Sequence, residues 1–447
     1  MLELVERNPA SEPHPARAAV LLFLLCLACY LANGRTVPFV MGGDTIPTRL
    51  IPFSLLAHGR LTLEPFRDEA AARGGFRWYV QEAKGRLVSF YPIGSSLVAL
   101  PVYVPLYLFL KAKGRGDDSA LFDASEKAEK IAASTIAAAA VAVFYLLLRR
   151  RTLPATAFWG AAAFGLASAQ WATASQMLWQ HGPVVLMLTT ALWLLTWPER
   201  PAWSAAGAGF ALAMAVLCRP TAAVFWLAGL AYVLSAGGSP RARLGRAFPF
   251  LAAGLPIAAF NLLYNLSFYD SVLGGYSDVA QNHLTLSGML QGTAGLLVSP
   301  NRGLLIYTPA ALLGIFGLAR AFRKPRCPLL IVFGLAAVAH LLLAGSFRLW
   351  HGGWSFGPRY LVDILPILGL AGTEMWPRLG RAGKGLAWAA LLGSVLVQLN
   401  GAVCYPASRW NLRMGDQLEQ GAWDWENFSL WQDFQAWWEL GDSAPRF

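Results

Sequence analysis

The chain has 447 residues, of which 56% are hydrophobic and only 14% are charged, and its mean hydropathy is +0.45. Soluble domains carry about 25% charged residues, so this composition excludes a soluble globular protein and predicts an all-α protein that crosses a membrane several times. The net charge of +11 does not indicate nucleic-acid binding, because the basic residues gather in short loops between apolar runs. The five cysteines lack ligand spacing and indicate neither a disulfide framework nor a zinc site.

Apolar runs of near-membrane length repeat along the chain. The first run, Ala18–Asn33, follows a short polar stretch that we expect on the cytoplasmic side, and it shows no convincing cleavage site, so we expect it to stay as an anchor. Further runs lie at about 129–148, 155–172, 183–197, 204–218, 221–236, 247–266, 304–320, 327–345, 360–376 and 385–404. The pattern predicts a bundle of about eleven transmembrane helices over residues 1–404 and a short exoplasmic tail over 405–447.

A further apolar run at 94–110 is only marginally long enough to cross, and Pro101 and Pro105 interrupt it. Its topology depends on the basic loops, which lie at 149–151, 241–246, 320–326 and 378–384. If these loops are all cytoplasmic, the run is a juxtamembrane or re-entrant element on the outer side. If the run crosses, all four loops face outward, against the positive-inside rule. We therefore predict a first exoplasmic loop over about 34–127 that contains juxtamembrane helices.

One carboxylate stands at the membrane–water boundary directly after the first span, in the segment MGGDTIPTRLIPFSLLAHG. Gly42 and Gly43 precede Asp44 and allow the backbone to approach a ligand closely. Ile46 precedes a proline and is biased away from helical dihedrals, whereas Pro47 suits a first helical turn, so we expect a short amphipathic helix from Pro47. The carboxylate of Asp44 either acts as a base or caps this helix, and the segment alone does not decide between the two roles.

The predicted topology places every chemically unusual segment on the outer face, whereas the cytoplasmic loops are short and basic. The outer segments are the Asp44 loop, Phe90–Gly94, Gln176–Pro183, Arg219–Pro220, Asp270–Pro309, Arg348–Asp363 and the tail from Tyr405. A transporter would concentrate polar groups near the bilayer midplane, where the sequence has few. The asymmetry favours an exoplasmic enzyme over a flippase or transporter of lipid-linked glycans. A non-catalytic membrane scaffold is the third alternative, and in it the acid and arginines of the outer loops would be dispensable.

Several residues of these outer segments are candidates for substrate binding. They are Arg49 after the Asp44 loop, His181 in WQHGP, Arg219 in CRPT, Arg302 in SPNRG, and His351, Arg359 and Tyr360 in HGGWSFGPRY. Each type has a structural alternative, because an interfacial histidine usually packs or hydrogen-bonds and an arginine at a helix boundary often only snorkels. Arg359 and Asp363 stand four residues apart and can pair with each other. We therefore expect Arg219 and Arg302 to matter more than Arg359 for binding an anion.

One acid near the first span and several arginines at span mouths match the needs of a glycosyltransferase that uses a polyprenyl-phosphate sugar. The leaving group of such a donor is a phosphate that departs as an anion, so it needs cations rather than a general acid. Arginine forks match phosphate oxygens. The acceptor hydroxyl needs a base, which the carboxylate of Asp44 can supply. The lipid tail needs an apolar groove, which a bundle of many spans can provide.

The chain resembles bacterial glycosyltransferases of the GT-C superfamily. Among them it is most similar to the protein-mannosyltransferase and aminoarabinose-transferase-like family, usually numbered 39, and its uncharacterised relatives. The resemblance covers residues 18–404 and rests on the order and spacing of short motifs. These are GGDT in the first exoplasmic loop, the juxtamembrane helices, YPIG where that family has YPPG, then QHGP, CRPT, SPNRG with YTP, and GGWSFGPRY.

This resemblance implies inverting transfer from a polyprenyl-phosphate sugar, with no nucleotide-binding domain, no cofactor and usually no obligate metal. It implies that Asp44 is the catalytic base and that Arg219, Arg302 and Arg359 are candidates for the phosphate. The partners implied are the lipid-linked donor, a glycan, lipid or protein acceptor, and membrane lipids, but no nucleic acid. The location implied is the bacterial inner membrane, with the active site facing the periplasm.

The chain departs from the family pattern in two places. Asp44 is a single acid followed by threonine, where relatives often have an adjacent pair of acids. About forty residues follow the last predicted span, where larger relatives have a soluble domain. Both departures lie on the exoplasmic side of the membrane, where the acceptor is expected, and so bear on the identity of the acceptor.

Overall fold

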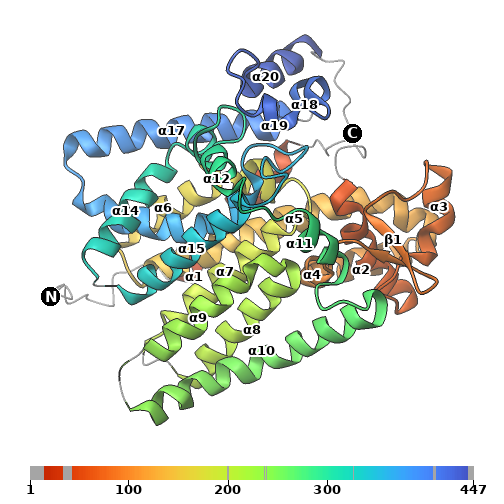
Figure 1. Cartoon of the computed structure of the whole chain (residues 1–447), viewed down its shortest axis with the longest axis horizontal. Coiled ribbons are helices and arrows are strands. Elements are labelled where there is room, and N and C mark those ends of the chain that lie inside the picture. The colour runs from red at the N-terminus through yellow and green to blue at the C-terminus, as the bar shows by residue number, and fades with distance from the viewer. Residues whose placement is uncertain are drawn as a thin grey trace.

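The structure is a computed structural model that describes residues 15–33, 43–198, 201–235, 237, 239–325, 327–405 and 409–440. The described elements are helices apart from one two-stranded hairpin (Figure 1). Most of the predicted cytoplasmic N-terminal stretch, Gly42 of the Asp44 segment and the last seven residues of the predicted tail lie outside the described residues.

The long helices run side by side between two ends of the molecule (Figure 1). They are α1 (Pro15–Ala32), α5 (Asp118–Arg149), α6 (Pro154–Leu166), α7 (His181–Leu195), α8 (Ala202–Cys218), α9 (Ala223–Ser235), α10 (Pro240–Tyr269), α14 (Ala311–Arg323), α15 (Pro328–Gly345), α16 (Leu365–Met375) and α17 (Arg381–Val403). Each helix overlaps one of the predicted apolar runs. Six helices of the described chain, including α4 (Gly94–Ala112), are long and apolar enough to cross a membrane. The predicted all-α membrane bundle is confirmed.

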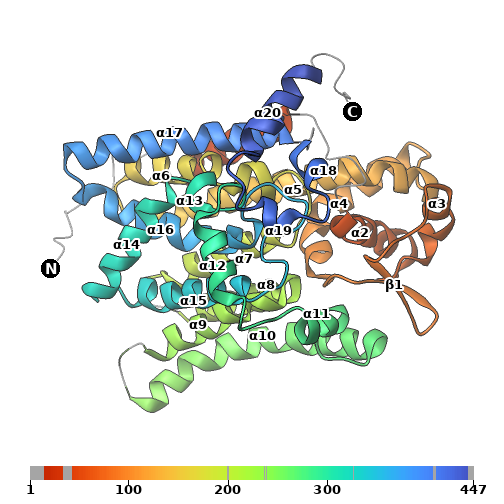
Figure 2. The same cartoon turned by 45° about the horizontal axis from the view of Figure 1, so that its top comes forward.

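Shorter elements connect these helices, and most of them cover one end of the bundle (Figure 2). They are η3 (Gly43–Thr45), α2 (Ile46–His58), η4 (Glu64–Phe66), α3 (Arg67–Ala72), β1 (Val80–Ala83), β2 (Arg86–Ser89), η5 (Gln170–Ala174), η6 (Pro220–Ala222), η7 (Gly274–Tyr276), α11 (Ser277–Asn282), α12 (Met289–Val298), α13 (Leu304–Tyr307), η8 (Arg359–Ile364), η9 (Trp376–Arg378), α18 (Arg409–Met414), α19 (Leu418–Gly421) and α20 (Ser429–Leu440). The strands β1 and β2 are antiparallel, with Val80 opposite Ser89.

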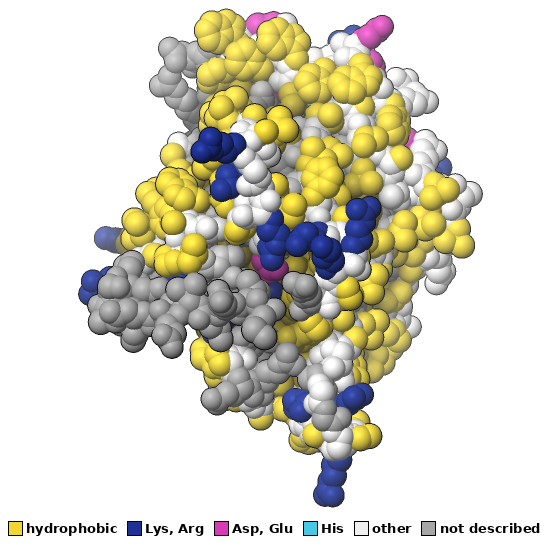
Figure 3. Space-filling view, turned by 90° about the vertical axis from the view of Figure 1, so that its left-hand side faces the viewer, with side chains coloured by type: hydrophobic (Ala, Val, Ile, Leu, Met, Phe, Trp, Pro, Cys, Tyr) yellow, Lys and Arg dark blue, Asp and Glu magenta, His cyan; other side chains and the backbone are white. Residues whose placement is uncertain are grey.

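The basic loops lie together at the other end of the bundle. Figure 3 looks onto this end, and Lys and Arg side chains are spread across it. Arg151, in the loop after α5, hydrogen-bonds Glu374 near the end of α16 and also Cys327, 3.0 Å away, at the start of α15. The loops that the positive-inside rule assigns to one side therefore share one end of the structure.

The α2 helix is buried rather than amphipathic. It begins at Ile46, one residue before the predicted start, and ends at Gly59, whose φ of 66° lies in the left-handed region that glycine adopts easily. Every residue from Ile46 to Ser54 is buried, because α2 packs against both α4 and α5. The expected amphipathic surface helix is thus wrong, and the segment after Asp44 is part of the core.

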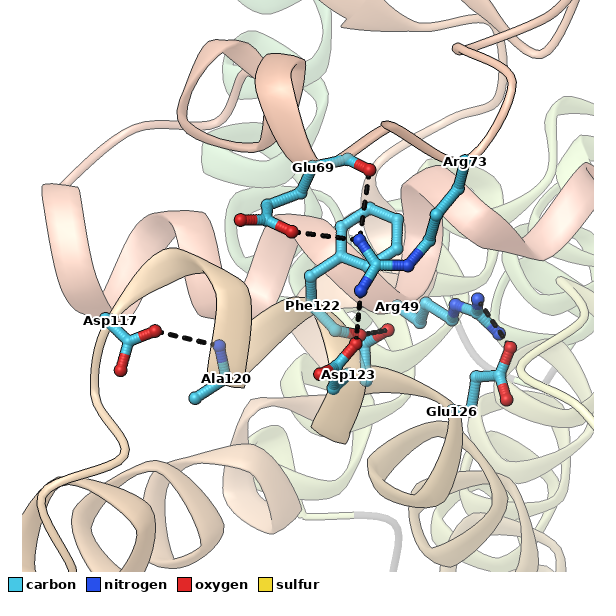
Figure 4. A network of polar contacts seen from close by, with 9 residues as sticks. Arg49, Glu69, Arg73, Asp117, Ala120, Phe122, Asp123 and Glu126 are labelled. Carbon is cyan, nitrogen blue, oxygen red and sulfur yellow. Dashed lines mark hydrogen bonds and ion pairs between the residues drawn. The ribbon is translucent and has the colours of Figure 1, made fainter. Parts of the chain in front are cut away.

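Ion pairs fix α2 and α3 along the first turns of α5 (Figure 4). Arg49 of α2 contacts Glu126 of α5 at 3.2 Å. Arg73, directly after α3, contacts Asp123 of α5 at 2.6 Å, and its guanidinium lies 4.7 Å above the ring of Phe122. The Arg73–Asp123 pair is exposed and contributes about 0–1 kcal/mol, so its role is to set the position of the first loop, whereas Arg49 makes its contact from a buried position.

Both ends of α4 lie at the end of the bundle opposite the basic loops. A Cβ at Gly94, the first residue of α4, would lie 2.4 Å from the backbone nitrogen of Cys218, so α4 begins against the end of α8. Ala112, its last residue, leads through a short turn to Asp117, the N-cap of α5. The far end of α5, at Arg149, joins the basic loops. Because α4 starts and ends at the same end, we propose that it is juxtamembrane, although its length and composition would also allow it to cross.

This arrangement predicts the accessibility of the turn between α4 and α5. We expect a cysteine at Arg115, close to Asp117, to react with an impermeant maleimide added to intact cells, and a cysteine at Arg323, in a basic loop, to stay protected until the membrane is opened. The wild-type chain measures the background from its own thiols. Protection of the Arg115 position with labelling of the Arg323 position would mean that α4 crosses the membrane.

Candidate active site

Asp44 lies in η3, the single turn that leads into α2. Thr45 occupies the N-cap position of α2, and no side-chain cap hydrogen bond closes that helix. Asp44 instead accepts a hydrogen bond from an Arg359 terminal nitrogen at 2.8 Å. The hydroxyl of Tyr91 also hydrogen-bonds Asp44. Of the two roles left open for Asp44, the structure does not show the helix cap, and it directs the carboxylate toward an arginine and a tyrosine.

Arg359 reaches Asp44 from η8, far along the chain. Its guanidinium lies 4.5 Å above the ring of Trp179 and 5.4 Å from the ring centre of Tyr360. Its Nε is buried and has no hydrogen-bond partner in the part of the chain that the structure describes. The pair keeps some access to solvent, since the side chains of Arg359 and Asp44 are 13% and 18% exposed. Arg359 therefore holds the carboxylate with one nitrogen and retains donors for a further acceptor.

A second set of charges lies behind this pair. Asp363 is fully buried and contacts Arg219 at 2.7 Å, His181 at 2.9 Å and His340 at 3.5 Å. The guanidinium of Arg219 also lies 5.1 Å from the ring centre of Tyr360. The described chain contains no group of three or more His, Cys, Asp or Glu side chains that could hold a metal ion. These side chains form a buried network in which the charges of Asp363 and Arg219 balance, and Tyr360 packs against it.

The expected pairing of Arg359 with Asp363 is wrong. That expectation assumed an α-helix, in which residues four apart share a face. Residues 359–364 form a 3₁₀-helix, in which residues three apart eclipse, so the two side chains point in different directions. Asp363 consequently neutralises Arg219, and the argument for ranking Arg359 last as an anion ligand loses its basis.

Arg302 is enclosed and committed to carbonyl and amide oxygens. It donates to the backbone oxygens of His351 at 3.0 Å and Gly353 at 3.1 Å, and to the side chain of Asn411 at 2.9 Å. Its guanidinium lies 4.5 Å above the ring of Trp410, and only 2% of the residue is exposed. These contacts join the loop that carries Arg359 to the C-terminal helices and leave little of the fork for a phosphate.

Asn301 completes this connection. Its side-chain nitrogen donates to the backbone oxygens of Gly421 and Asp424, both at 2.8 Å, and its oxygen accepts from the backbone of Ser429 at 2.7 Å. The C-terminal segment is therefore a docked unit of α18, α19 and α20. Sequence reasoning singled out SPNRG as a phosphate motif, whereas its Asn–Arg pair holds this unit in place.

Two more of the sequence candidates position other groups. Arg49 pairs with the buried Glu129 at 3.3 Å, and Glu129 in turn accepts from the backbone of Leu178 at 2.9 Å. His351 accepts from the backbone of Gly353 at 3.1 Å. Burial, together with nearby arginine charges, lowers the pKa of His351 to about 4, so its ring is neutral at pH 7.

Aromatic side chains that sequence reasoning did not single out surround Asp44. Tyr276 exchanges hydrogen bonds of 3.0 and 3.1 Å with Gln180, and its ring stacks on Phe90 with centroids 5.8 Å apart. Tyr91 lies edge-on to Tyr276 at 6.1 Å and to Trp78 at the same distance. Burial raises the pKa of both Tyr91 and Tyr276, so both keep their hydroxyl protons. The YPIG motif drew attention to the segment that contains Tyr91, but it did not predict that Tyr91 packs beside Asp44.

Solved structures of two membrane proteins share this fold. The oligosaccharyltransferase AglB from Archaeoglobus fulgidus, in complex with an inhibitory peptide and a dolichol-phosphate, is 12% identical, with a TM-score of 0.55 over 88% of this chain and 56% of that chain. ArnT from Cupriavidus metallidurans bound to undecaprenyl phosphate is 14% identical, with a TM-score of 0.50 over 95% of this chain and 75% of that chain.

These similarities concern the fold. The same ArnT without ligand gives a TM-score of 0.52 at 13% identity. No protein-family model and no curated protein matches the sequence. The chain spans just over half the length of the archaeal protein. The expected all-α membrane bundle is confirmed at the level of the fold.

The contacts of Arg302 predict a structural defect when it is replaced. Arg302→Ala leaves several buried oxygens without donors, which costs about 1–3 kcal/mol for each group, so we expect a lower melting temperature and faster proteolysis between α17 and α20. Arg413→Ala, which removes an exposed arginine of α18, is the matched control and should change neither. An Arg302→Ala protein as stable as wild type, with weakened binding of undecaprenyl phosphate, would return Arg302 to the phosphate site.

The docked C-terminal unit should be sensitive to pH through Asp433. Burial in α20 raises the pKa of Asp433 to about 7, although the backbone of Trp410 and the charge of Arg302 oppose this. A carboxyl whose pKa is higher in the folded state stabilises that state fully only below its unfolded pKa, near 4, and the contribution is lost as the pH rises through 7.

We therefore expect residues 409–440 to resist proteolysis better at pH 5.5 than at pH 8, and Asp433→Asn to abolish most of that difference by stabilising the unit at pH 8. Asp416→Asn, on the turn before α19, serves as the control. An unchanged pH difference in the Asp433→Asn protein would mean that another group is responsible.

Proposed function

We propose that this protein is an integral membrane glycosyltransferase that moves a sugar from a polyprenyl-phosphate donor to an acceptor hydroxyl, with inversion. The observation that carries the proposal is the contact of Asp44 with Arg359, because it joins a carboxylate base to a cation with donors to spare in one partly open site. Proteins of the same fold hold undecaprenyl phosphate or dolichol-phosphate, which supports a lipid-phosphate donor.

Each side chain of the pair has a separate task in this reaction. Asp44 accepts the proton of the acceptor hydroxyl as its oxygen attacks the anomeric carbon of the sugar. The bond from that carbon to the phosphate oxygen breaks on the opposite face, and its electron pair leaves with the phosphate, so the configuration inverts. Arg359 binds the departing phosphate through donors that Asp44 does not use, and this stabilises the charge that develops there.

The buried network makes this arrangement rigid. The guanidiniums of Arg219 and Arg359 lie 5.1 and 5.4 Å from the ring centre of Tyr360, and the bonds of Asp363 to Arg219 and His181 hold Arg219 in place. Tyr91 fixes the carboxylate of Asp44 from the other side. A base and an anion site that are held before the substrate arrives need little reorganisation during the reaction.

An apolar cavity suits the lipid tail of the donor. It measures about 580 Å³ and lies among α6, α14, α16 and α17. Leu365, which follows η8 directly, lines it, and no charged residue does. A flippase that carried a phosphate through the membrane would need polar groups along such a path. The cavity therefore favours lipid anchoring over the alternative of transport.

The proposal includes an orientation in the membrane. The basic loops share the end opposite the candidate site, and the positive-inside rule assigns that end to the cytoplasm (Figure 3). The site then faces the periplasm or the exterior of a bacterial inner membrane, where a lipid-linked sugar rather than a nucleotide sugar is the available donor.

Asp44→Asn tests the base directly. We expect the variant to fold and to lose transfer of label from undecaprenyl-phosphate-linked hexoses and pentoses by about 10²–10⁴-fold, as is typical when a general base is removed. Asp68→Asn changes an exposed acid of the same loop and should keep wild-type turnover. If the Asp44→Asn enzyme retains more than about a tenth of wild-type turnover, the base lies elsewhere.

A further inference from the structure

A large aromatic ring beside the candidate site is left exposed. Trp78, two residues before β1, is 60% exposed. Its ring is nevertheless held by T-shaped contacts with Tyr79 at 5.7 Å and with Tyr91 at 6.1 Å, with interplanar angles of 74° and 72°. Because 60% of Trp78 stays exposed beside these two contacts, the indole still offers a flat apolar surface to a ligand.

That ring borders the space next to Asp44. A Cβ built at Gly43, the residue directly before Asp44, would lie 3.5 Å from the Cζ2 of Trp78 and 3.1 Å from the Cδ1 of Tyr79. Tyr91, which contacts the edge of Trp78, hydrogen-bonds Asp44. An acceptor whose hydroxyl reaches Asp44 therefore lies within reach of the indole face.

Contact with lipid does not explain the exposure of Trp78. The neighbouring Arg77 is exposed, and the hairpin that follows carries exposed charges. Arg67 and Glu82, whose side chains are 51% and 64% exposed, approach to 4.0 Å across this surface. A surface with this many charges lies in water, beyond the belt in which tryptophan anchors a protein to the bilayer.

We propose that Trp78 is the stacking platform of the acceptor subsite and that the acceptor is a saccharide. The inference rests on the proposed function and adds the acceptor class to it. A sugar ring has an apolar C–H face that fits the indole and a rim of hydroxyls. Tyr91 and the Gln180–Tyr276 pair provide polar groups for that rim. An aromatic wall with a few convergent polar groups is the usual lining of a small-molecule site.

The subsite orients the reaction of Asp44. With one ring of the acceptor stacked on Trp78, a hydroxyl at its rim faces Asp44, which takes its proton as the new glycosidic bond forms and the bond to the donor phosphate breaks. The donor phosphate stays on the side of Arg359. Trp78 is thus a binding residue for the acceptor only, and its loss should leave the donor site intact.

The test uses the full-length protein in nanodiscs. Undecaprenyl-phosphate-linked hexoses and pentoses are the labelled donors. The acceptors are a panel of methyl glycosides of glucose, galactose, mannose, rhamnose and N-acetylglucosamine, a Ser/Thr-rich peptide, and phosphatidylglycerol. We expect label on at least one glycoside, and for that acceptor Trp78→Ala should raise KM about tenfold or more, as loss of a tryptophan anchor does. Trp78→Phe keeps a flat ring and should retain most of the affinity.

Arg77→Ala is the matched control, since it removes the exposed cation next to Trp78 and should leave the KM for a neutral glycoside unchanged. Binding of undecaprenyl phosphate should be the same in all three variants. Label on the peptide or the lipid but on no glycoside overturns the acceptor class, and a Trp78→Ala enzyme with wild-type KM overturns the platform. A wild-type protein that releases no undecaprenyl phosphate from any donor contradicts the proposed function itself, which separates the two failures.

Discussion

The site depends on one ion pair, in which Asp44 of η3 contacts Arg359 of η8 at 2.8 Å. A partly buried pair is stable only when its geometry is held from both sides. On one side, the ion pair of Arg49 with Glu129 holds α2 against α5, so the turn that carries Asp44 is held in position. On the other, the buried Asp363 network fixes η8. The short helices and loops at this end of the bundle therefore bring these two charges together.

Each arginine of the predicted phosphate set has a different counterpart at the end of the bundle opposite the basic loops. Asp363 neutralises Arg219. Arg302 donates its hydrogen bonds to carbonyl and amide oxygens and so ties the Arg359 loop to the C-terminal helices. Arg359 combines a carboxylate partner with a buried Nε that has no partner in the described chain. One arginine can therefore hold the empty site in order and then bind an anion, while the others maintain its surroundings.

The sequence predicted the bundle because membrane spans are visible in composition alone, and it singled out Asp44 as a candidate because an acid at a span mouth is rare. It did not predict which side chains the candidate site residues contact. The pairing of Arg359 with Asp363 failed because a 3₁₀-turn replaced the assumed α-helix. The role of Arg302 was missed because backbone oxygens, which satisfy it, leave no sequence pattern. Trp78 and Tyr276 come from loops that meet near Asp44 only in the folded chain.

The central claim is that Asp44 and Arg359, although in contact, serve opposite sides of the reaction. The most direct measurement is the affinity of undecaprenyl phosphate for the wild-type, Asp44→Asn and Arg359→Ala proteins in nanodiscs. The account predicts that Asp44→Asn binds at least as tightly as wild type, because a competing and repelling carboxylate is gone. It predicts that Arg359→Ala binds about ten- to a hundredfold more weakly, because charge-assisted hydrogen bonds are lost. Equal weakening in both folded variants, or none in Arg359→Ala, would contradict it.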